Sequence, residues 1–209
     1  MYMLMAIIGI SGKMGTQLYE YFKDKFEIVG IDIINFPNVP TFKSLKDVNK
    51  KIDVVVDFSS IKAYDELKYA IDNKIITLSG TTGYSDEEID NLFKIGGNLF
   101  YWSSNYAKGI NLFTRLIKLI KKEYSLFDFI EIHALTKKDS PSGTAKMLAR
   151  ELDIPYEKIQ SIRMHYAPPI HELIFSSKNE QITIRHEVTN AIAFLEGFEN
   201  KLNEMIGVG

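Results

Sequence analysis

The stretch that decides the fold is LMAIIGISGKMG, residues 4–15. An apolar run leads into Gly9, Gly12 and Gly15, and the segment that follows, TQLYEYF, has helical periodicity. A strand, a glycine turn and a helix in this order bind the pyrophosphate of a dinucleotide in doubly wound folds, because the turn and the helix N-terminus present backbone N–H groups. The spacing GxxGxxG departs from the usual GxGxxG, and the glycines alone would also fit a turn that only allows close packing.

Asp32 strengthens the dinucleotide interpretation. It lies about 20 residues beyond the glycines, at the end of the second predicted strand, where a carboxylate usually accepts the ribose hydroxyls. The alternative is an ordinary turn-forming aspartate. A carboxylate here disfavours a 2′-phosphate, and Ile33 brings no compensating charge, whereas Lys13 in the glycine loop would bring one. We therefore expect NADH as the cofactor, with NADPH possible.

Short apolar runs alternate with helical segments through roughly the first hundred residues. The predicted strands are Leu4–Ile10, Phe26–Ile33, Asp53–Phe58, Ile75–Ser79 and Leu99–Ser103. The predicted helices are Met14–Lys23, Lys62–Asn73 and Asp86–Lys94, and residues 35–40 form a loop with two prolines. This alternation predicts an α/β architecture, a Rossmann-like doubly wound parallel sheet.

The pattern changes from Asn105 onward and predicts a smaller α+β domain. Its predicted elements are a helix over Ile110–Lys122, a strand over Phe127–Leu135, a short helix after a Pro-Ser-Gly turn, strands over Ile170–Ser176 and Gln181–Val188, and a closing helix over Ala191–Met205. We expect that helix to return to the first domain. The predicted domains are therefore 1–104 with 189–209, and 105–188.

Composition excludes several classes of protein. Hydrophobic residues make up 45% and charged residues 25%, as in an average globular domain, and a net charge of -2 argues against a nucleic-acid partner. The chain has no cysteine, which removes disulfides, thiol catalysis and cysteine-based metal sites. The apolar opening lacks the basic flank of a signal peptide, and no run is long enough to span a membrane. We expect a cytoplasmic protein that acts on a small molecule and has no membrane partner.

Two further loops lie where an open α/β sheet binds ligands, beyond the carboxyl ends of its strands. They are DFSS, residues 57–60, and SGTTG, residues 79–83. Either one alone would fit a plain strand-to-helix turn, but after a dinucleotide motif they indicate the walls of a nicotinamide pocket. The residues expected to bind the cofactor from these segments are Gly9, Ser11, Gly12, Lys13, Met14, Gly15, Asp32, Phe58, Ser59, Gly80, Thr81 and Thr82.

The segment EIHALTKKDSPSGTAKMLA, residues 131–149, brings together groups for acid catalysis and anion binding. His133 ends a predicted strand and Lys137 follows in the loop, so both can turn toward one ligand. The residues PSGT, 141–144, then open a helix whose first N–H groups suit a carboxylate or phosphate. The alternative is a buried, hydrogen-bonded histidine beside a solvated lysine and a capped helix.

This segment resembles the dihydrodipicolinate reductase family, whose members carry a pattern like E-x-H-H-x-x-K-x-D-A-P-S-G-T-A. The chain matches it at Glu131, His133, Lys137, Asp139, Pro141, Ser142, Gly143, Thr144 and Ala145. The stretches GISGKMG, VVDFSS, SGTTG and NYAKG (residues 105–109) follow the family's order as well, so the resemblance spans nearly the whole chain.

The resemblance implies reduction of 4-hydroxy-tetrahydrodipicolinate, or of dihydrodipicolinate, to tetrahydrodipicolinate with NAD(P)H in diaminopimelate and lysine biosynthesis. It implies that His133 is the general acid and that Lys137 supports developing charge and holds a substrate carboxylate. It adds Asn105 and Tyr106 to the cofactor site and a homotetramer built through the second domain's sheet. The residues that it implies for substrate binding are Ala134, Lys137, Ser142, Gly143 and Thr144.

The chain departs from the family at several places, among them Ser140, where the family pattern has alanine. Ala134 replaces the second histidine of the pair, and Asn190 and Ala191 stand where the family has a Ser-Arg pair. Two alternatives therefore stay open, another nicotinamide-dependent dehydrogenase of a small dicarboxylate or amino acid, and a non-catalytic dinucleotide sensor. We assign no role to the other histidines, His165, His171 and His186, and because no group of them has metal-ligand spacing we expect no metal site.

Overall fold

The protein is described by a computed structural model that covers residues 2–208. The chain divides into two compact units, Met1–Ser103 together with Glu199–Gly209, and Ser104–Phe198. The chain therefore returns to the first unit ten residues later than we placed it, after residue 198 and not after 188. Packing explains the difference, because Phe198 lies against Tyr106 with ring centroids 5.1 Å apart. Within the described residues, no helix has both the length and the apolar character to cross a membrane.

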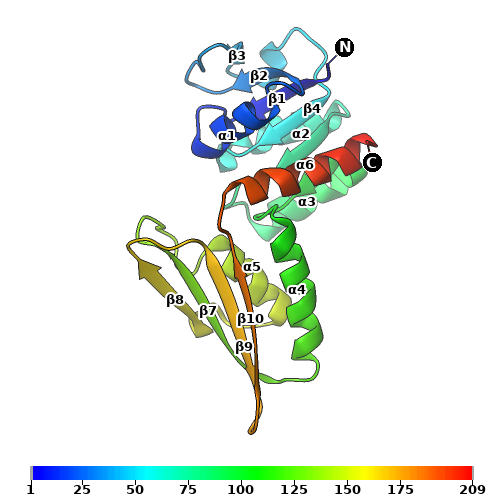
Figure 1. Cartoon of the computed structure of the whole chain (residues 1–209). Helices are drawn as coiled ribbons and strands as arrows, with labels where there is room; N and C mark the ends of the chain where they lie inside the picture. Colours follow the sequence, from blue (N-terminus) through cyan, green and yellow to red (C-terminus); the bar gives the residue numbers. More distant parts are fainter. Residues whose placement is uncertain (1, 209) are drawn as a thin grey trace. The chain divides into compact units, whose positions relative to one another are not determined.

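The first unit is a parallel six-stranded sheet in the order β3-β2-β1-β4-β5-β6, which confirms the predicted doubly wound fold. Figure 1 labels the first four of these strands. Its strands are β1 (Leu4–Ile8), β2 (Glu27–Ile31), β3 (Thr41–Phe42), β4 (Val54–Asp57), β5 (Ile76–Ser79) and β6 (Phe100–Trp102). Its helices are α1 (Lys13–Phe22), α2 (Tyr64–Asp72) and α3 (Asp86–Gly96). We did not predict β3, since two residues carry no detectable period.

The glycine turn after β1 is as tight as its sequence suggests. Gly9 has a φ of +77°, a backbone conformation that favours glycine, and the Gly12 N–H donates to its carbonyl at 3.0 Å. A Cβ at Gly15 would lie 2.1 Å from the same carbonyl oxygen. Glycine is thus required at both ends of the turn so that α1 begins against the end of β1.

The second unit has a four-stranded mixed sheet in the order β10-β9-β7-β8, in which only β7 and β8 are parallel neighbours. Its elements are α4 (Lys108–Lys121), β7 (Leu126–Ala134), α5 (Gly143–Leu152), β8 (Ile159–Met164), β9 (Ile170–Ser176) and β10 (Gln181–Glu187), and α6 (Ile192–Ile206) closes the chain (Figure 1). Strand β8 escaped prediction because IQSIRM has neither clean alternation nor a continuous apolar run.

The two faces of this sheet differ. One face packs on α4 and α5 through a buried apolar cluster that includes Phe113, Leu148 and Phe129. The side chains that alternate to the opposite face are less covered, and Ile162 and Met164 of β8 are 42% and 48% exposed. The covered face is therefore the one on which polar side chains of β7 and β9 become buried.

Replacement of Gly15 by alanine tests the tight turn. The added Cβ meets backbone atoms that a side-chain rotation cannot move, so we expect Gly15→Ala to lower the free energy of unfolding by about 2 kcal/mol or more. Gly143→Ala is the matched control, since no atom would lie within 4 Å of its Cβ. It should leave stability unchanged or raise it by up to about 1 kcal/mol. Urea denaturation measures both, and equal midpoints would contradict the packing account.

Candidate active site

Asp32 and the glycine loop form one hydrogen-bonded unit at the carboxyl end of β2. Its Oδ2 accepts the Ser11 N–H at 3.0 Å and the Ser11 hydroxyl at 2.6 Å, while Oδ1 accepts the Ile34 N–H at 3.1 Å. Partial burial would raise the pKa of Asp32, but these hydrogen bonds outweigh it and hold the pKa below its ordinary value. The carboxylate is therefore ionised at neutral pH. Gly12 and Lys13, which follow Ser11 in the chain, are exposed.

A second polar cluster follows β4 and β5. The buried Asp57 carboxylate accepts the Ser59 hydroxyl at 2.6 Å and the Ser79 hydroxyl at 2.8 Å, and the Thr81 hydroxyl accepts the Ser59 N–H at 2.9 Å. Burial raises the pKa of Asp57 despite these hydrogen bonds. The cluster fixes the two loops against each other. A Cβ at Gly80 would lie 2.0 Å from the Phe58 ring, so these two predicted residues are in contact.

Three other predicted cofactor residues lie on or near these loops. Met14 and Gly15 are in the first turn of α1, and Thr82 is exposed directly after Thr81. Two predicted residues, Asn105 and Tyr106, do not lie there. Asn105 and Tyr106 belong to the second unit and are buried there. The Asn105 side chain accepts the Ala107 N–H at 2.9 Å and donates to the Thr144 hydroxyl at 3.1 Å. A direct cofactor contact of Asn105 and Tyr106 stays a prediction.

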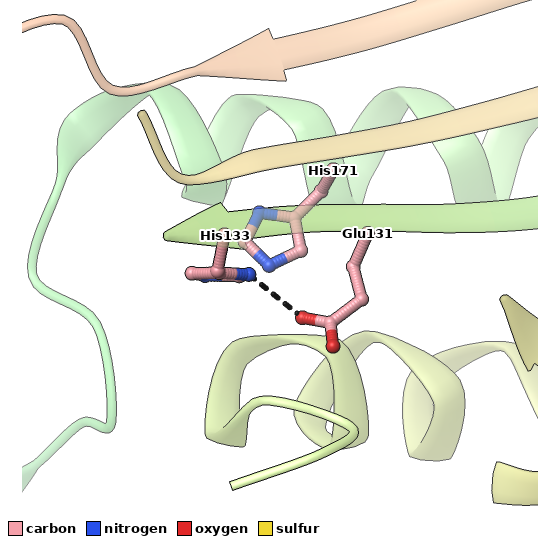
Figure 2. A group of neighbouring side chains, drawn as sticks. All are labelled: Glu131, His133 and His171. Atoms are coloured by element: carbon pink, nitrogen blue, oxygen red, sulfur yellow. Dashed lines mark ion pairs between the residues drawn. The ribbon is translucent and has the colours of Figure 1, made fainter. Parts of the chain in front are cut away.

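The second unit brings Glu131, His133 and His171 together on the covered face of its sheet (Figure 2). Glu131 and His133 are two residues apart in β7 and so share a face, and the strand register pairs Glu131 with His171 of β9. Glu131 Oε2 lies 3.0 Å from His133 Nδ1, an ion-pair distance without linear hydrogen-bond alignment. Figure 2 shows the His171 ring beside this pair.

Ser142 and Arg163 complete the cluster. Glu131 Oε1 accepts the Ser142 N–H at 3.2 Å and lies 2.9 Å from Arg163 Nη2, and the Ser142 hydroxyl lies 3.4 Å from His171 Nε2. Burial alone would raise the pKa of Glu131, but hydrogen bonds from its neighbours outweigh it and hold the pKa far below the ordinary value. Burial lowers the pKa of His171 to about 3, so this imidazole is neutral.

Lys137 and the N-terminus of α5 already share one carboxylate. Asp139 Oδ1 lies 2.8 Å from Lys137 Nζ, and its Oδ2 accepts the Gly143 N–H at 3.2 Å. Ser142 caps the helix, with its hydroxyl accepting the Ala145 N–H at 3.2 Å. Ala134 ends β7, and its carbonyl accepts the Lys137 N–H at 2.9 Å, which closes the turn that carries the lysine.

His171 and Arg163 were not among the predicted site residues. We gave His171 no role and expected no metal-ligand spacing, yet His171, His133 and Glu131 offer ligand atoms within 4.8 Å of one another. The signal is absent from the linear sequence because strand pairing creates it, with Ser161, Glu131, His171 and His186 in register across the sheet. Arg163 already bonds the carboxylate of this group, and its positive charge opposes a cation there.

Comparisons with known proteins agree over both units. Residues 3–106 match the family model described as dihydrodipicolinate reductase, N-terminus, and residues 109–206 match the model for the C-terminus. The chain is 32% identical to 4-hydroxy-tetrahydrodipicolinate reductase of Caldanaerobacter subterraneus subsp. tengcongensis, over 96% of this chain and 92% of that protein. It is 33% identical to the Rickettsia bellii protein of the same name, over 90% and 83%.

Solved structures agree in fold. Dipicolinate-bound dihydrodipicolinate reductase from Paenisporosarcina sp. TG-14 matches with a TM-score of 0.83 at 23% identity, over 99% of this chain and 96% of that one. Aspartate dehydrogenase from Thermotoga maritima matches with a TM-score of 0.62 at 15% identity, over 98% and 97%. Because the two family models together cover nearly the whole sequence, the chain belongs to the dihydrodipicolinate reductase family.

Proposed function

We propose that this protein reduces 4-hydroxy-tetrahydrodipicolinate, or the dihydrodipicolinate that it yields on losing water, with NADH, and that His133 is the general acid. The observation that carries the proposal is the arrangement in the second unit. The buried His133 imidazole lies against the ionised Glu131 carboxylate, and the same segment, residues 131–149, contains Lys137 and the N-terminus of α5. Family membership favours this reductase over another dehydrogenase or a non-catalytic sensor.

The first unit fits a dinucleotide. The N-cap of α1, Gly12, makes no side-chain cap hydrogen bond, and the first turn holds no acidic residue, so the positive end of the helix suits a pyrophosphate. The ionised Asp32 suits the ribose hydroxyls. Ser11 already donates to this carboxylate, so the ribose would share it with the loop that holds the phosphates.

When bound, the nicotinamide supplies the hydride. The protein's part is to place the acceptor and deliver a proton. His133 protonates the enamine-like carbon that hydride addition leaves, and the imidazole becomes neutral as that C–H bond forms. The 6% exposure of His133 keeps most water from the proton-donating ring. Lys137 offsets negative charge on the substrate as the reaction proceeds.

Asp139 supports the predicted carboxylate site. Its side chain bridges Lys137 Nζ and the Gly143 N–H, so these two groups are spaced to hold one carboxylate between them. A substrate carboxylate would take the place of Asp139, and Thr144 at the second position of α5 would add its N–H and hydroxyl. Lys137 is 40% exposed at the side chain, which leaves it accessible to such a ligand.

The direct test is NADH oxidation by the purified chain with substrate generated enzymatically, in the presence of EDTA. The proposal expects turnover that stops when the substrate-generating enzyme is omitted. Turnover only with a different dicarboxylate or amino acid would indicate another dehydrogenase. NADH binding without turnover of any of them would indicate a sensor.

Substitution of His133 and Lys137 separates their roles. General acid catalysis typically contributes about 10²- to 10⁴-fold, so His133→Gln should lower kcat by that order while NADH binding survives. Lys137→Ala should lower kcat and raise KM, since a cation that grips a carboxylate acts in the ground and transition states alike. Steady-state kinetics and NADH fluorescence titration measure both. A folded His133→Gln variant with near-normal kcat would refute the assignment.

Cofactor choice is tested at Asp32. We expect NADH to bind at least as tightly as NADPH, because the ionised carboxylate repels a 2′-phosphate. Asp32→Ser should strengthen NADPH binding relative to NADH binding. Lys13→Ala should have the opposite effect and strengthen the preference of the unaltered protein for NADH. If the unaltered protein binds NADPH far more tightly in calorimetry, Lys13 outweighs Asp32 and the preference is wrong.

The less covered face of the second unit's sheet is proposed to pack against a second copy of the chain, as the family resemblance suggests for a homotetramer. Its apolar side chains include Ile162 and Met164, and Arg185 and Glu172 form a cross-strand ion pair at 3.2 Å. Because a symmetric interface places the same residues on both sides, Ile162→Lys should dissociate the assembly. Leu119→Lys, at an exposed leucine of α4, is the control. Sedimentation velocity should show smaller species for the first variant only; identical distributions would contradict the interface.

A further inference from the structure

We propose that Glu131 is the positioning residue of the substrate site, fixing the general acid, the N-terminus of α5 and the Lys137 loop through one buried carboxylate. This inference rests on the reductase function proposed above. Glu131 does not contact the reacting atoms in that mechanism, and its effect on catalysis passes through the groups that it holds.

The contacts of the carboxylate divide between its two oxygens. Oε1 takes the Ser142 N–H at 3.2 Å and Arg163 Nη2 at 2.9 Å, and Oε2 faces His133 Nδ1 at 3.0 Å. The side chain is fully buried, so no solvent competes for these positions. One carboxylate thus joins the strand that carries the acid to the residue that caps the anion-binding helix.

Arg163 extends this hold to the loop between β7 and α5. Its Nη2 donates to the Asp139 carbonyl at 2.6 Å, and its Nε donates to the Lys137 carbonyl at 3.4 Å. The guanidinium presents several donors in a rigid plane, so it can bind a carboxylate and two carbonyls together. An ammonium group at the same place would act as a point charge and would not hold both carbonyls.

The charge of Glu131 sets the proton on the imidazole. An ionised carboxylate accepts hydrogen bonds and donates none, and Glu131 Oε2 faces Nδ1 at 3.0 Å, so its charge favours a proton on Nδ1 of His133. Nε2 is then the nitrogen left to donate a proton to the substrate. A glutamine that keeps its oxygen toward Arg163 and Ser142 would turn its NH2 group toward Nδ1. That donor favours an unprotonated Nδ1, with the proton on Nε2. It also disfavours an imidazole that carries protons on both nitrogens.

Glu131→Gln is the first experiment because it conserves shape. We expect kcat to fall about 10²-fold or more, within the range of general acid catalysis, with little change in KM for the substrate or in NADH affinity. Imidazole ¹⁵N NMR gives a readout that loss of stability alone would not produce. The His133 signal, assigned by its loss in His133→Gln, should show a protonated Nδ1 in the unaltered protein and an unprotonated Nδ1 in Glu131→Gln.

Arg163→Lys tests the contacts of Arg163 with the loop between β7 and α5. It remains a test of the proposal if Glu131→Gln does not fold. It keeps a positive charge beside Glu131 but loses the carbonyl contacts, so KM for the substrate should rise about tenfold with a smaller change in kcat. Arg115→Lys, at an exposed arginine of α4, should change neither constant. Unaltered kcat and His133 tautomer in Glu131→Gln, or unaltered KM in Arg163→Lys, would overturn the proposal. Absence of turnover in the unaltered protein would instead refute the reductase function.

Discussion

The ion pair between the buried Glu131 and Arg163 is the constraint on which the proposed substrate site depends. A carboxylate without access to water is tolerated only when charged and polar partners surround it. Those partners are His133, Ser142 and the Arg163 guanidinium, and they come from three different segments of the chain. The cost of burying a charge is thus offset by contacts that also order the site.

The cofactor half depends on a different constraint, the space available to the backbone. Position 15 must be glycine because any side chain there would meet the Gly9 carbonyl, and position 9 favours glycine because its φ is positive. This close approach lets α1 begin against the end of β1. Ser11 then ties Asp32 to the same turn. Steric exclusion thus orders the predicted cofactor site, whereas buried electrostatics order the proposed substrate site. The two kinds of constraint differ in how clearly the sequence reveals them.

The glycine loop, the parallel sheet and the 131–149 segment were predictable because each depends on residues close together in the chain. Gly9 directly follows the first strand and Asp32 directly follows the second. These positions in the sequence predict a tight turn after the first strand and a carboxylate at the end of the second. His171 and Arg163 were not predictable, because their place beside Glu131 follows from antiparallel pairing with β9 and parallel pairing with β8. Strand β8 itself lacks a clear period, so neither its existence nor its register could be obtained from the pattern. Glu131 appeared in the motif, but nothing local indicated that its side chain is buried.

The most direct measurement is a crystal structure of the protein with NADH and a planar dicarboxylate that resembles the substrate. The account predicts that one ligand carboxylate displaces Asp139 from Lys137 Nζ and the Gly143 N–H. His133 Nδ1 should remain on Glu131 Oε2, with Nε2 turned toward the ligand ring. A His133 side chain rotated away from Glu131, or a ligand carboxylate bound to neither Lys137 nor the start of α5, would contradict it.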